Sequence, residues 1–259
     1  MRYVIALLPV IFLSGVAFGD IQAETVEYSD GETVSKGYFA YDDSSDAERP
    51  AVLVIHEWWG LNDFARAKAR ELAEAGYLAF ACDMYGRGET TDSPERAAEL
   101  AGALRAEPAL LRKRAAAALA ALKGHRLADS ERTAAIGFCF GGGAALELAR
   151  SGADVDGVVS FHGDLDTGEG AEAGKVKAAV LVLHGGDDPH VSDADLKSFM
   201  DEMRTAGADW QVNIYGGAVH SFTNPAAGGD PSSGAAYDKE AARRAWDAMR
   251  AFFEDIFGG

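Results

Sequence analysis

The sequence predicts a single α/β domain in which a mostly parallel sheet is covered by helices on both faces. Short, almost continuously apolar segments alternate along the chain with amphipathic segments of helical periodicity. Apolar runs of this kind are typical of strands buried on both faces. No repeat, linker or low-complexity block divides the sequence. Its 259 residues are 48% hydrophobic and 25% charged, which is ordinary for one globular domain of this size.

The elements follow one another in a strand and helix order. Residues 25–42 alternate β-forming side chains around an Asp30-Gly31 turn, which predicts an opening hairpin. The other predicted strands are apolar runs that end in glycine or polar residues, and they cover 49–60, 78–86, 133–139, 155–163, 178–186 and 210–217. The predicted helices cover 63–77, 93–124 (as one helix or two), 141–152, 193–207 and 239–257. Residues 223–240 are rich in glycine, proline and serine and predict a surface loop.

The first residues of the chain predict export. An arginine precedes an apolar run over residues 3–18, and small and polar residues follow, which is the pattern of a secretory signal peptide. Cleavage is possible after Gly19 or Ala23. We expect residues 1–23 to be removed and 24–259 to form the mature domain, in the periplasm or outside the cell. A membrane anchor is the alternative, but a proline and a glycine interrupt the run, which is shorter than the roughly 20 residues that a spanning helix needs.

Charge and cysteine content narrow the function. The formal net charge of −17 disfavours nucleic-acid binding, because phosphate backbones are repelled. In an exported protein the two cysteines, Cys82 and Cys139, could form a disulfide. A domain with its own core has little need of one bridge, so two separate thiols are preferred. The spacing of cysteine and histidine matches no zinc pattern, and the sequence predicts neither a metal nor a cofactor.

Polar and reactive residues gather where the predicted strands end, the place where parallel sheets bind ligands. Gly137, Cys139 and Gly141 have the G-x-S-x-G spacing of a nucleophile elbow with cysteine in the serine position. The N-terminus of the following helix would favour the thiolate. Taken alone, Cys139 could equally be a small buried hydrophobe, because free cysteines usually are.

The order of later residues favours the nucleophile. Hydrolases with this elbow place an acid and then a histidine after the nucleophile. Asp188, preferred here over Asp187, follows one predicted strand, and His220 follows the next. His220 would act as base towards the Cys139 thiol, and Asp188 would fix its tautomer and orientation.

The segment around Trp58 completes the predicted site. In elbow hydrolases one oxyanion-hole amide comes from the residue after the nucleophile and the other from an early strand end. These are the main-chain N–H groups of Phe140 and Trp58. Trp59 and His162 also follow predicted strands at this edge and are candidates for substrate contact, although a purely structural role for His162 is the alternative.

Five ordered motifs together resemble the dienelactone hydrolase family, which are α/β-hydrolases with a Cys-His-Asp triad. The motifs are VIHEWWGLND, DMYGRG, IGFCFGG, HGGDDP and YGGAVHSF. The resemblance spans about residues 50–225 and implies the α/β-hydrolase fold, with Cys139, Asp188 and His220 as the triad. It also implies a monomer whose substrate is a small ester or lactone.

The same resemblance assigns roles to residues around the triad. It implies that Glu57 contacts the resting cysteine and helps the thiol ionise when substrate enters. It matches Arg87 to one of two arginines that hold the substrate carboxylate in the family's type enzyme. The second arginine falls at about Asn224, which is not basic, so specificity for dienelactones does not follow from the motifs.

The motifs leave several chemistries open. Ester or lactone hydrolysis is the leading prediction, and the same triad could carry out acyl transfer or cleave thioesters or peptides. A binding protein on a hydrolase scaffold is a non-enzymatic alternative. A redox role for Cys82 and Cys139 is another, and it requires a disulfide between them.

Overall fold

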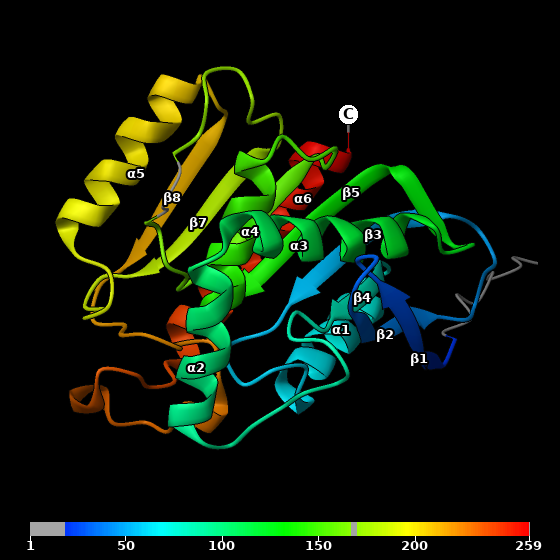
Figure 1. The fold of residues 1–259 in the computed structure, drawn as a ribbon, viewed down its shortest axis with the longest axis horizontal. Coiled ribbons are helices and arrows are strands. Elements are labelled where there is room, and N and C mark those ends of the chain that lie inside the picture. The colour runs from blue at the N-terminus through cyan, green and yellow to red at the C-terminus, as the bar shows by residue number, and fades with distance from the viewer. Residues whose placement is uncertain (1–18, 167–169, 259) are drawn as a thin grey trace, which may run out of the picture.

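The computed structural model describes residues 19–166 and 170–258, and its centre is one eight-stranded sheet (Figure 1). The strand order is β1-β2-β4-β3-β5-β6-β7-β8, with β1 and β2 antiparallel to their neighbours and the other strands parallel. The strands are β1 (Ile21–Ser29), β2 (Val34–Asp42), β3 (Arg49–Ile55), β4 (Leu78–Cys82), β5 (Ala128–Phe138), β6 (Gly157–Phe161), β7 (Ala179–Gly185) and β8 (Trp210–Tyr215).

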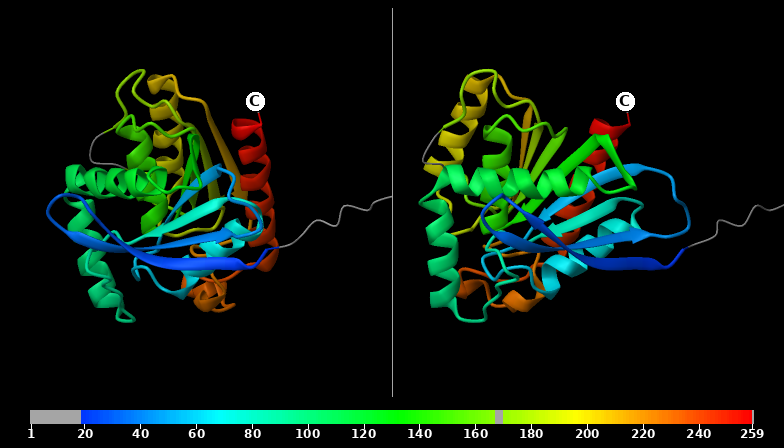
Figure 2. Two further views of the ribbon diagram at one scale, coloured as in Figure 1. Left: turned by 90° about the vertical axis from the view of Figure 1, so that its right-hand side faces the viewer. Right: turned by 45° about the vertical axis from the view of Figure 1, so that its right-hand side comes forward.

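Helices cover both faces of the sheet, as the alternation of segments predicts. They are α1 (Asp63–Glu74), α2 (Pro94–Arg105), α3 (Pro108–Lys123), α4 (Phe140–Arg150), α5 (Asp193–Ala206) and α6 (Lys239–Phe257). Apolar residues of α1 and α6 belong to one core cluster, and those of α2 to α5 belong to a second cluster on the other face. Figure 2 shows α6 and α3 on opposite sides of the sheet. The predicted α/β class is therefore confirmed.

The element boundaries refine the predictions. The hairpin around Asp30-Gly31 is present, as β1 and β2. The segment 93–124 forms two helices, because Pro108 starts α3 after a short break. The fifth strand begins at Ala128, five residues before the predicted start, because the polar stretch before Thr133 is a partly exposed extension.

The predicted signal peptide lies mainly outside the described residues, which begin at Gly19. Strand β1 begins at Ile21, where it pairs with Asp42 of β2. Cleavage after Gly19 would leave this strand whole, whereas cleavage after Ala23 would remove its first three residues. Within the described parts of the chain, no helix is long and apolar enough to cross a membrane.

Two glycines allow the strand and helix around Cys139 to pack closely. A Cβ on Gly137 would lie 1.9 Å from the carbonyl oxygen of Gly141, and a Cβ on Gly141 would lie 2.3 Å from that of Ile55. Both obstacles are backbone atoms, which no rotamer change can move. Glycine is therefore required here by the approach of helix α4 to strands β3 and β5.

Gly137→Ala is expected to lower the free energy of unfolding by more than about 3 kcal/mol, because the backbone must shift to admit the methyl group. Gly102→Ala is the matched control: Gly102 is an exposed residue inside α2, with nothing within 4 Å of its added Cβ. This control should gain about 0.5–1 kcal/mol from helix propensity. Urea unfolding measures both, and similar values for the two variants would contradict the close-packing account.

Candidate active site

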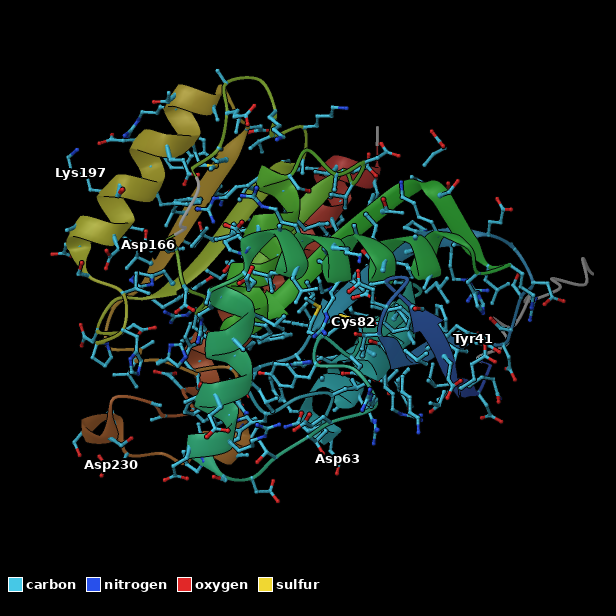
Figure 3. The ribbon with its side chains drawn as sticks, viewed as in Figure 1. Tyr41, Asp63, Cys82, Asp166, Lys197 and Asp230 are labelled. Atoms are coloured by element: carbon cyan, nitrogen blue, oxygen red, sulfur yellow. The ribbon has the colours of Figure 1, made fainter. Side chains whose placement is uncertain are left out.

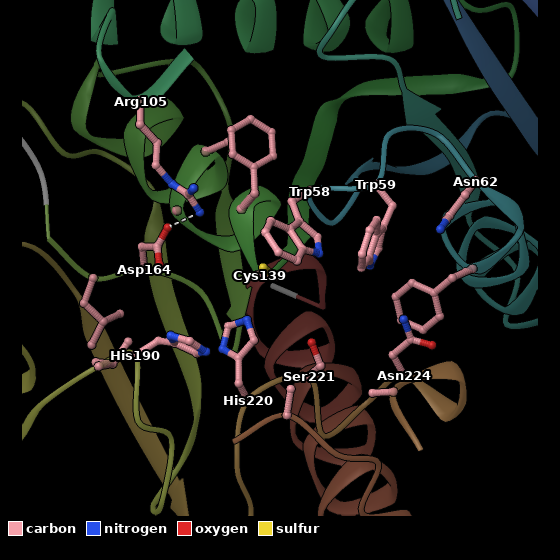
Figure 4. A pocket seen from close by; sticks show the side chains of 18 of the residues that line it. Trp58, Trp59, Asn62, Arg105, Cys139, Asp164, His190, His220, Ser221 and Asn224 are labelled. Atoms are coloured by element: carbon pink, nitrogen blue, oxygen red, sulfur yellow. Dashed lines mark ion pairs between the residues drawn. The ribbon is translucent and has the colours of Figure 1, made fainter. Parts of the chain in front are cut away.

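Cys139 occupies a sharp turn between β5 and α4. Its backbone has φ +54° and ψ −119°, a conformation that residues other than glycine rarely adopt. Its N–H donates to the carbonyl oxygen of Phe161 on β6 at 3.0 Å, which anchors the turn to the sheet. The residue is the N-cap of α4 and lines the main cavity (Figure 4). This is the strained strand–turn–helix geometry of a nucleophile elbow.

His220 connects Cys139 to Asp188. Its Nδ1 lies 2.8 Å from Asp188 Oδ2, and the ring interacts electrostatically with the Cys139 side chain. Figure 4 shows the ring pointing towards Cys139. Burial works against protonation, but the hydrogen bond to Asp188 and the attraction of Asp188 and Cys139 outweigh it and raise the pKa of His220 to about 10. The ring of His220 therefore lies between Asp188 and Cys139 and binds its proton more tightly than a free imidazole does.

Asp188, and not Asp187, faces the histidine. Asp188 follows β7 and its carboxylate is fully buried, while Asp187 beside it is exposed. The second carboxylate oxygen accepts a hydrogen bond from the N–H of His190 at 2.9 Å. Burial alone would raise the pKa of Asp188, but the hydrogen bond and charge of His220 lower it below its ordinary value. Asp188 thus orients His220 as a fixed, charged partner.

The ion pair predicts a pH-dependent stability. The pKa of His220 is higher in the folded chain than in the unfolded one, so its contribution is complete below about pH 6.5 and is lost as pH rises through about 10. The pKa of Asp188 is lowered, so its contribution is present above about pH 4 and is lost as pH falls. Asp188→Asn should therefore lower the free energy of unfolding most between about pH 4 and 6.5, and progressively less towards pH 10.

Urea unfolding between pH 4 and 10 checks this expectation. Asp187→Asn is the control, because it removes the same charge from an exposed neighbour. A difference between Asp188→Asn and the unsubstituted protein that does not vary with pH would contradict the proposed pair.

The turn before Trp58 is held by a buried histidine. His56 Nδ1 lies 2.5 Å from the carbonyl oxygen of Glu57, and its Nε2 accepts from the N–H of Met84 at 3.1 Å. Burial lowers the pKa of His56, which fits the neutral form with its proton on Nδ1. The hydroxyl of Tyr85 donates to the carbonyl oxygen of Trp58 at 2.8 Å. These contacts fix the backbone where the predicted oxyanion donor lies.

The cavity above Cys139 has a volume of about 1130 Å³. Trp58 and Trp59 form one wall, with ring centroids 4.8 Å apart, and His190 lies beside His220 at 4.8 Å between ring centroids. His190 is exposed, and its position two residues after Asp188 brings it to the cavity. Within the described residues, no group of three or more His, Cys, Asp or Glu could hold a metal ion.

The family model described as "Dienelactone hydrolase family" matches residues 36–257. The chain belongs to the dienelactone hydrolase family. The motif resemblance and the α/β-hydrolase fold predicted from it are thereby confirmed.

Individual relatives agree with this family. A solved "Dienelactone Hydrolase-like Promiscuous Phospotriesterase" from metagenomic libraries is 43% identical, with a TM-score of 0.88, over 92% of this chain and 99% of that one. The "Putative carboxymethylenebutenolidase" of Saccharolobus solfataricus is 30% identical over 240 residues, covering 80% of this chain and 89% of that protein. An α/β hydrolase from a Medee basin deep-sea metagenome is 18% identical with a TM-score of 0.70, over 92% of this chain and 99% of that one, and shares the fold.

The resemblance assigns roles to Glu57 and Arg87, and the surroundings of both residues differ from those it implies. Glu57 is buried, and its hydrogen bonds come from Ser221, at 3.3 Å, and Asn224, at 2.5 Å. Neither of these two partners is Cys139, the contact that the resemblance implies. Burial raises the pKa of Glu57, while the two donors and the charge of His220 oppose the rise. Asn224, at the position expected for a second arginine, thus holds the carboxyl group of Glu57.

Arg87 does not line the cavity, which corrects its assignment as the substrate anchor. It is exposed, with φ +60°, and its N–H is tied to the carbonyl oxygen of Val34 on β2 at 2.8 Å. Asp83, which accepts hydrogen bonds from Gly86 and Gly88 at 2.7 and 2.8 Å, holds this loop against β2. The motif DMYGRG therefore builds a turn, and an arginine elsewhere reaches the cavity.

That arginine is Arg105, at the end of α2, and the sequence reading overlooked it. Only its place in the last turn of an amphipathic helix could have drawn attention to it.

The predicted substrate contact of His162 is also corrected. His162 is buried and does not line the cavity, and its Nε2 lies 2.7 Å from Thr223 Oγ1. Its ring packs edge-on behind His220 at 5.3 Å between centroids, so its role is structural support. Trp59 does line the cavity, as predicted for a substrate contact.

Both cysteines are free thiols. Cys82 ends β4 inside the core, where Figure 3 labels it, and burial raises the pKa of its thiol. The disulfide that the redox alternative requires is not formed between these residues of the described chain. Cys139 differs from Cys82 in facing both the cavity and His220.

Proposed function

We propose that this member of the dienelactone hydrolase family hydrolyses small carboxylic esters or lactones, with Cys139 as the nucleophile. The observation that carries the proposal is that the His220 ring bonds Asp188 at 2.8 Å and points towards Cys139, with Cys139 and His220 both lining the cavity (Figure 4). A nucleophile within reach of a base, which a third group orients, is the arrangement needed for covalent acyl chemistry.

The first half-reaction acylates the cysteine. The Cys139 sulfur attacks the substrate carbonyl carbon, and the thiol proton resides on His220. When the tetrahedral intermediate collapses, the carbon–oxygen bond to the leaving group breaks and His220 gives its proton to that oxygen. In a lactone the leaving oxygen stays attached, so the ring opens. The product of this step is a thioester on Cys139.

The second half-reaction needs His220 as a base, and acylation of Cys139 lowers the pKa of His220 so that it can act as one. The negative charge of a Cys139 thiolate would help to raise the pKa of His220 to about 10. Once the sulfur is part of a thioester, this charge is gone and the pKa falls. Neutral His220 can then take a proton from water, which attacks the thioester and releases the acid, with the sulfur as leaving group.

The N–H groups of Trp58 and Phe140 would hold the oxyanion. Phe140 is the first residue of α4, where N–H groups lack intrahelical partners. Within residues 19–166 and 170–258, neither Trp58 N–H nor Phe140 N–H donates to another protein group. Both residues line the cavity next to Cys139. These free donors support an oxyanion hole, in which each donor contributes about 3–4 kcal/mol in the transition state.

A substrate panel tests the proposal. Purified protein is assayed with neutral aryl esters, δ- and γ-lactones, acyl thioesters and a short peptide, each in water and with an added alcohol. Hydrolysis of the esters or lactones, with the acid as main product and a mass gain on Cys139 after acid quench, is expected. Preference for peptide or thioester, or transfer mainly to the alcohol, would replace the proposal with that chemistry. No turnover would favour a binding protein.

A second candidate is phosphotriester hydrolysis. The 43% identical relative is named a promiscuous phosphotriesterase. The cavity of about 1130 Å³ has space for the three arms of such a neutral substrate. The Cys139 sulfur would attack phosphorus, one alkoxide would leave with the proton of His220, and water would then free the sulfur. Release of nitrophenolate from a dialkyl nitrophenyl phosphate, together with a dialkylphosphoryl mass on Cys139, would establish this activity.

We also propose that the protein is exported. The apolar run of residues 3–18 supports this, and β1 starting at Ile21 favours cleavage after Gly19 over cleavage after Ala23. Expression with the natural N-terminus in a bacterium, followed by fractionation and N-terminal sequencing, tests both points. Full-length protein in the cytoplasm would contradict export.

A further inference from the structure

The arginine of the cavity is already neutralised. Arg105 is the one Lys or Arg among the cavity-lining residues in the described part of the chain. Its Nη2 lies 2.6 Å from Asp164 Oδ2, and both side chains are partly exposed, at 42% and 35% (Figure 4). The guanidinium also lies over the ring of Phe140, 5.6 Å from its centroid. A substrate entering the cavity therefore meets an ion pair and not a free cation.

The carboxylate of this pair is held in place by the fold. Asp164 follows β6 through His162, whose φ of +39° turns the chain towards the cavity. The next residue, Leu165, accepts a hydrogen bond at its carbonyl oxygen from buried Arg150 at 2.9 Å. Arg150 is in turn paired with Glu202 at 2.8 Å. Asp164 is thus presented to Arg105 by an anchored loop.

The remaining surroundings do not compensate for the loss of positive charge. Five further acidic residues of the described chain line the cavity: Asp63, Asp92, Glu147, Asp166 and Asp195. Asn224 is neutral and its amide is engaged with Glu57, and Arg87 lies outside the cavity. A carboxylate-bearing substrate would find no unpaired arginine here and several negative charges.

We infer that Asp164 is a specificity-determining residue, which by pairing with Arg105 directs the cavity to esters and lactones without an anionic group. This inference rests on the proposed hydrolase function and narrows its substrate class to neutral molecules. It also predicts that removing the Asp164 charge frees Arg105 to bind a substrate carboxylate at the position that the Asp164 carboxylate occupies.

The test compares two substrates that differ only in charge. They are the mono-p-nitrophenyl ester of adipic acid and its primary amide, p-nitrophenyl adipamate, whose reacting carbonyls are equivalent. The measured quantity is the ratio of kcat/KM for the anion to that for the amide, which does not depend on the fraction of folded enzyme. The unsubstituted protein should favour the amide.

Asp164→Asn should raise this ratio about fivefold, the upper end of what a partly exposed ion pair supports. The gain should shrink in 0.5 M NaCl and should vanish in Asp164→Asn/Arg105→Gln. Asp92→Asn is the matched control, since it removes the same charge from the cavity lining without releasing Arg105. Equal gains in Asp92→Asn and Asp164→Asn, or a gain that survives Arg105→Gln, would overturn the inference.

Binding separates this inference from the proposed hydrolysis. Affinities for adipate monomethyl ester and methyl adipamate are measured by calorimetry with Cys139→Ala and Cys139→Ala/Asp164→Asn. The same fivefold change in the ratio of affinities supports the role of Asp164 even when no ester is turned over. An unchanged ratio overturns it even when hydrolysis by Cys139 is established.

Discussion

Cys139→Ala is expected to lower kcat/KM for a neutral aryl ester by at least about 10⁴-fold, because nucleophile removal leaves only binding and the oxyanion donors. The structure accounts for the size of this loss: the turn raises this one sulfur into the cavity, next to His220. Initial rates at several substrate concentrations measure the effect, and circular dichroism verifies the fold. The acyl mass on the protein should disappear together with turnover.

Cys82→Ala is the matched control for the thiol. Cys82 is buried at the end of β4 and does not line the cavity, so its replacement should cost stability and little activity per folded molecule. Cys139→Ser keeps a nucleophilic atom of smaller size and should retain some of the lost activity. Turnover by Cys139→Ala close to that of the unsubstituted protein would exclude Cys139 as the nucleophile.

His220→Ala should lower the same kcat/KM by about 10⁴-fold, since one residue both activates the thiol and protonates the leaving group. The alkylation rate of Cys139 by iodoacetamide near pH 7 should fall too, because the imidazolium that stabilises the thiolate is absent. Added imidazole should restore part of the turnover, since the cavity is open above Cys139. The assay is the aryl ester rate with and without imidazole.

His190→Ala is the matched control for the histidine. The rings of His190 and His220 line the same cavity and their centroids are 4.8 Å apart. The described hydrogen bond from His190 to Asp188, however, is donated by its backbone N–H and not by its ring. Its loss should cost less than about tenfold, the low end of general acid–base effects. A loss for His190→Ala as large as that for His220→Ala would move the base to His190.

Most of the fold could be predicted because its strands are buried on both faces. The segment 178–183 is apolar throughout, which fits a strand that is covered on both faces. The elbow could be predicted for a related reason: Gly137 and Gly141 mark a backbone approach that tolerates no Cβ. The proximity of Cys139, Asp188 and His220 could be predicted from their order along the chain, because strands that end at one edge bring distant loops together.

The side-chain partners could not be predicted in this way. Glu57 contacts Asn224, which is 167 residues away, and nothing in the local sequence of either residue specifies that bond. Arg87 follows a strand end and reads as a site residue, yet its N–H bond to Val34 fixes its turn outside the cavity. Arg105 reads as an ordinary helix-terminal residue, yet α2 carries it to the cavity wall.

By itself, the sequence determined the α/β class, the turn at Cys139 and the order of Asp188 and His220 after it. The reason is that strand burial and close backbone contacts depend on the residue types of short segments. Tertiary structure alone decided which arginine reaches the cavity, and that Asp164 neutralises it. Such charges come from helices and loops far apart in the chain. The distance between Arg105 and Asp164 depends on how α2 and the loop after β6 pack against each other. No short sequence pattern specifies that packing.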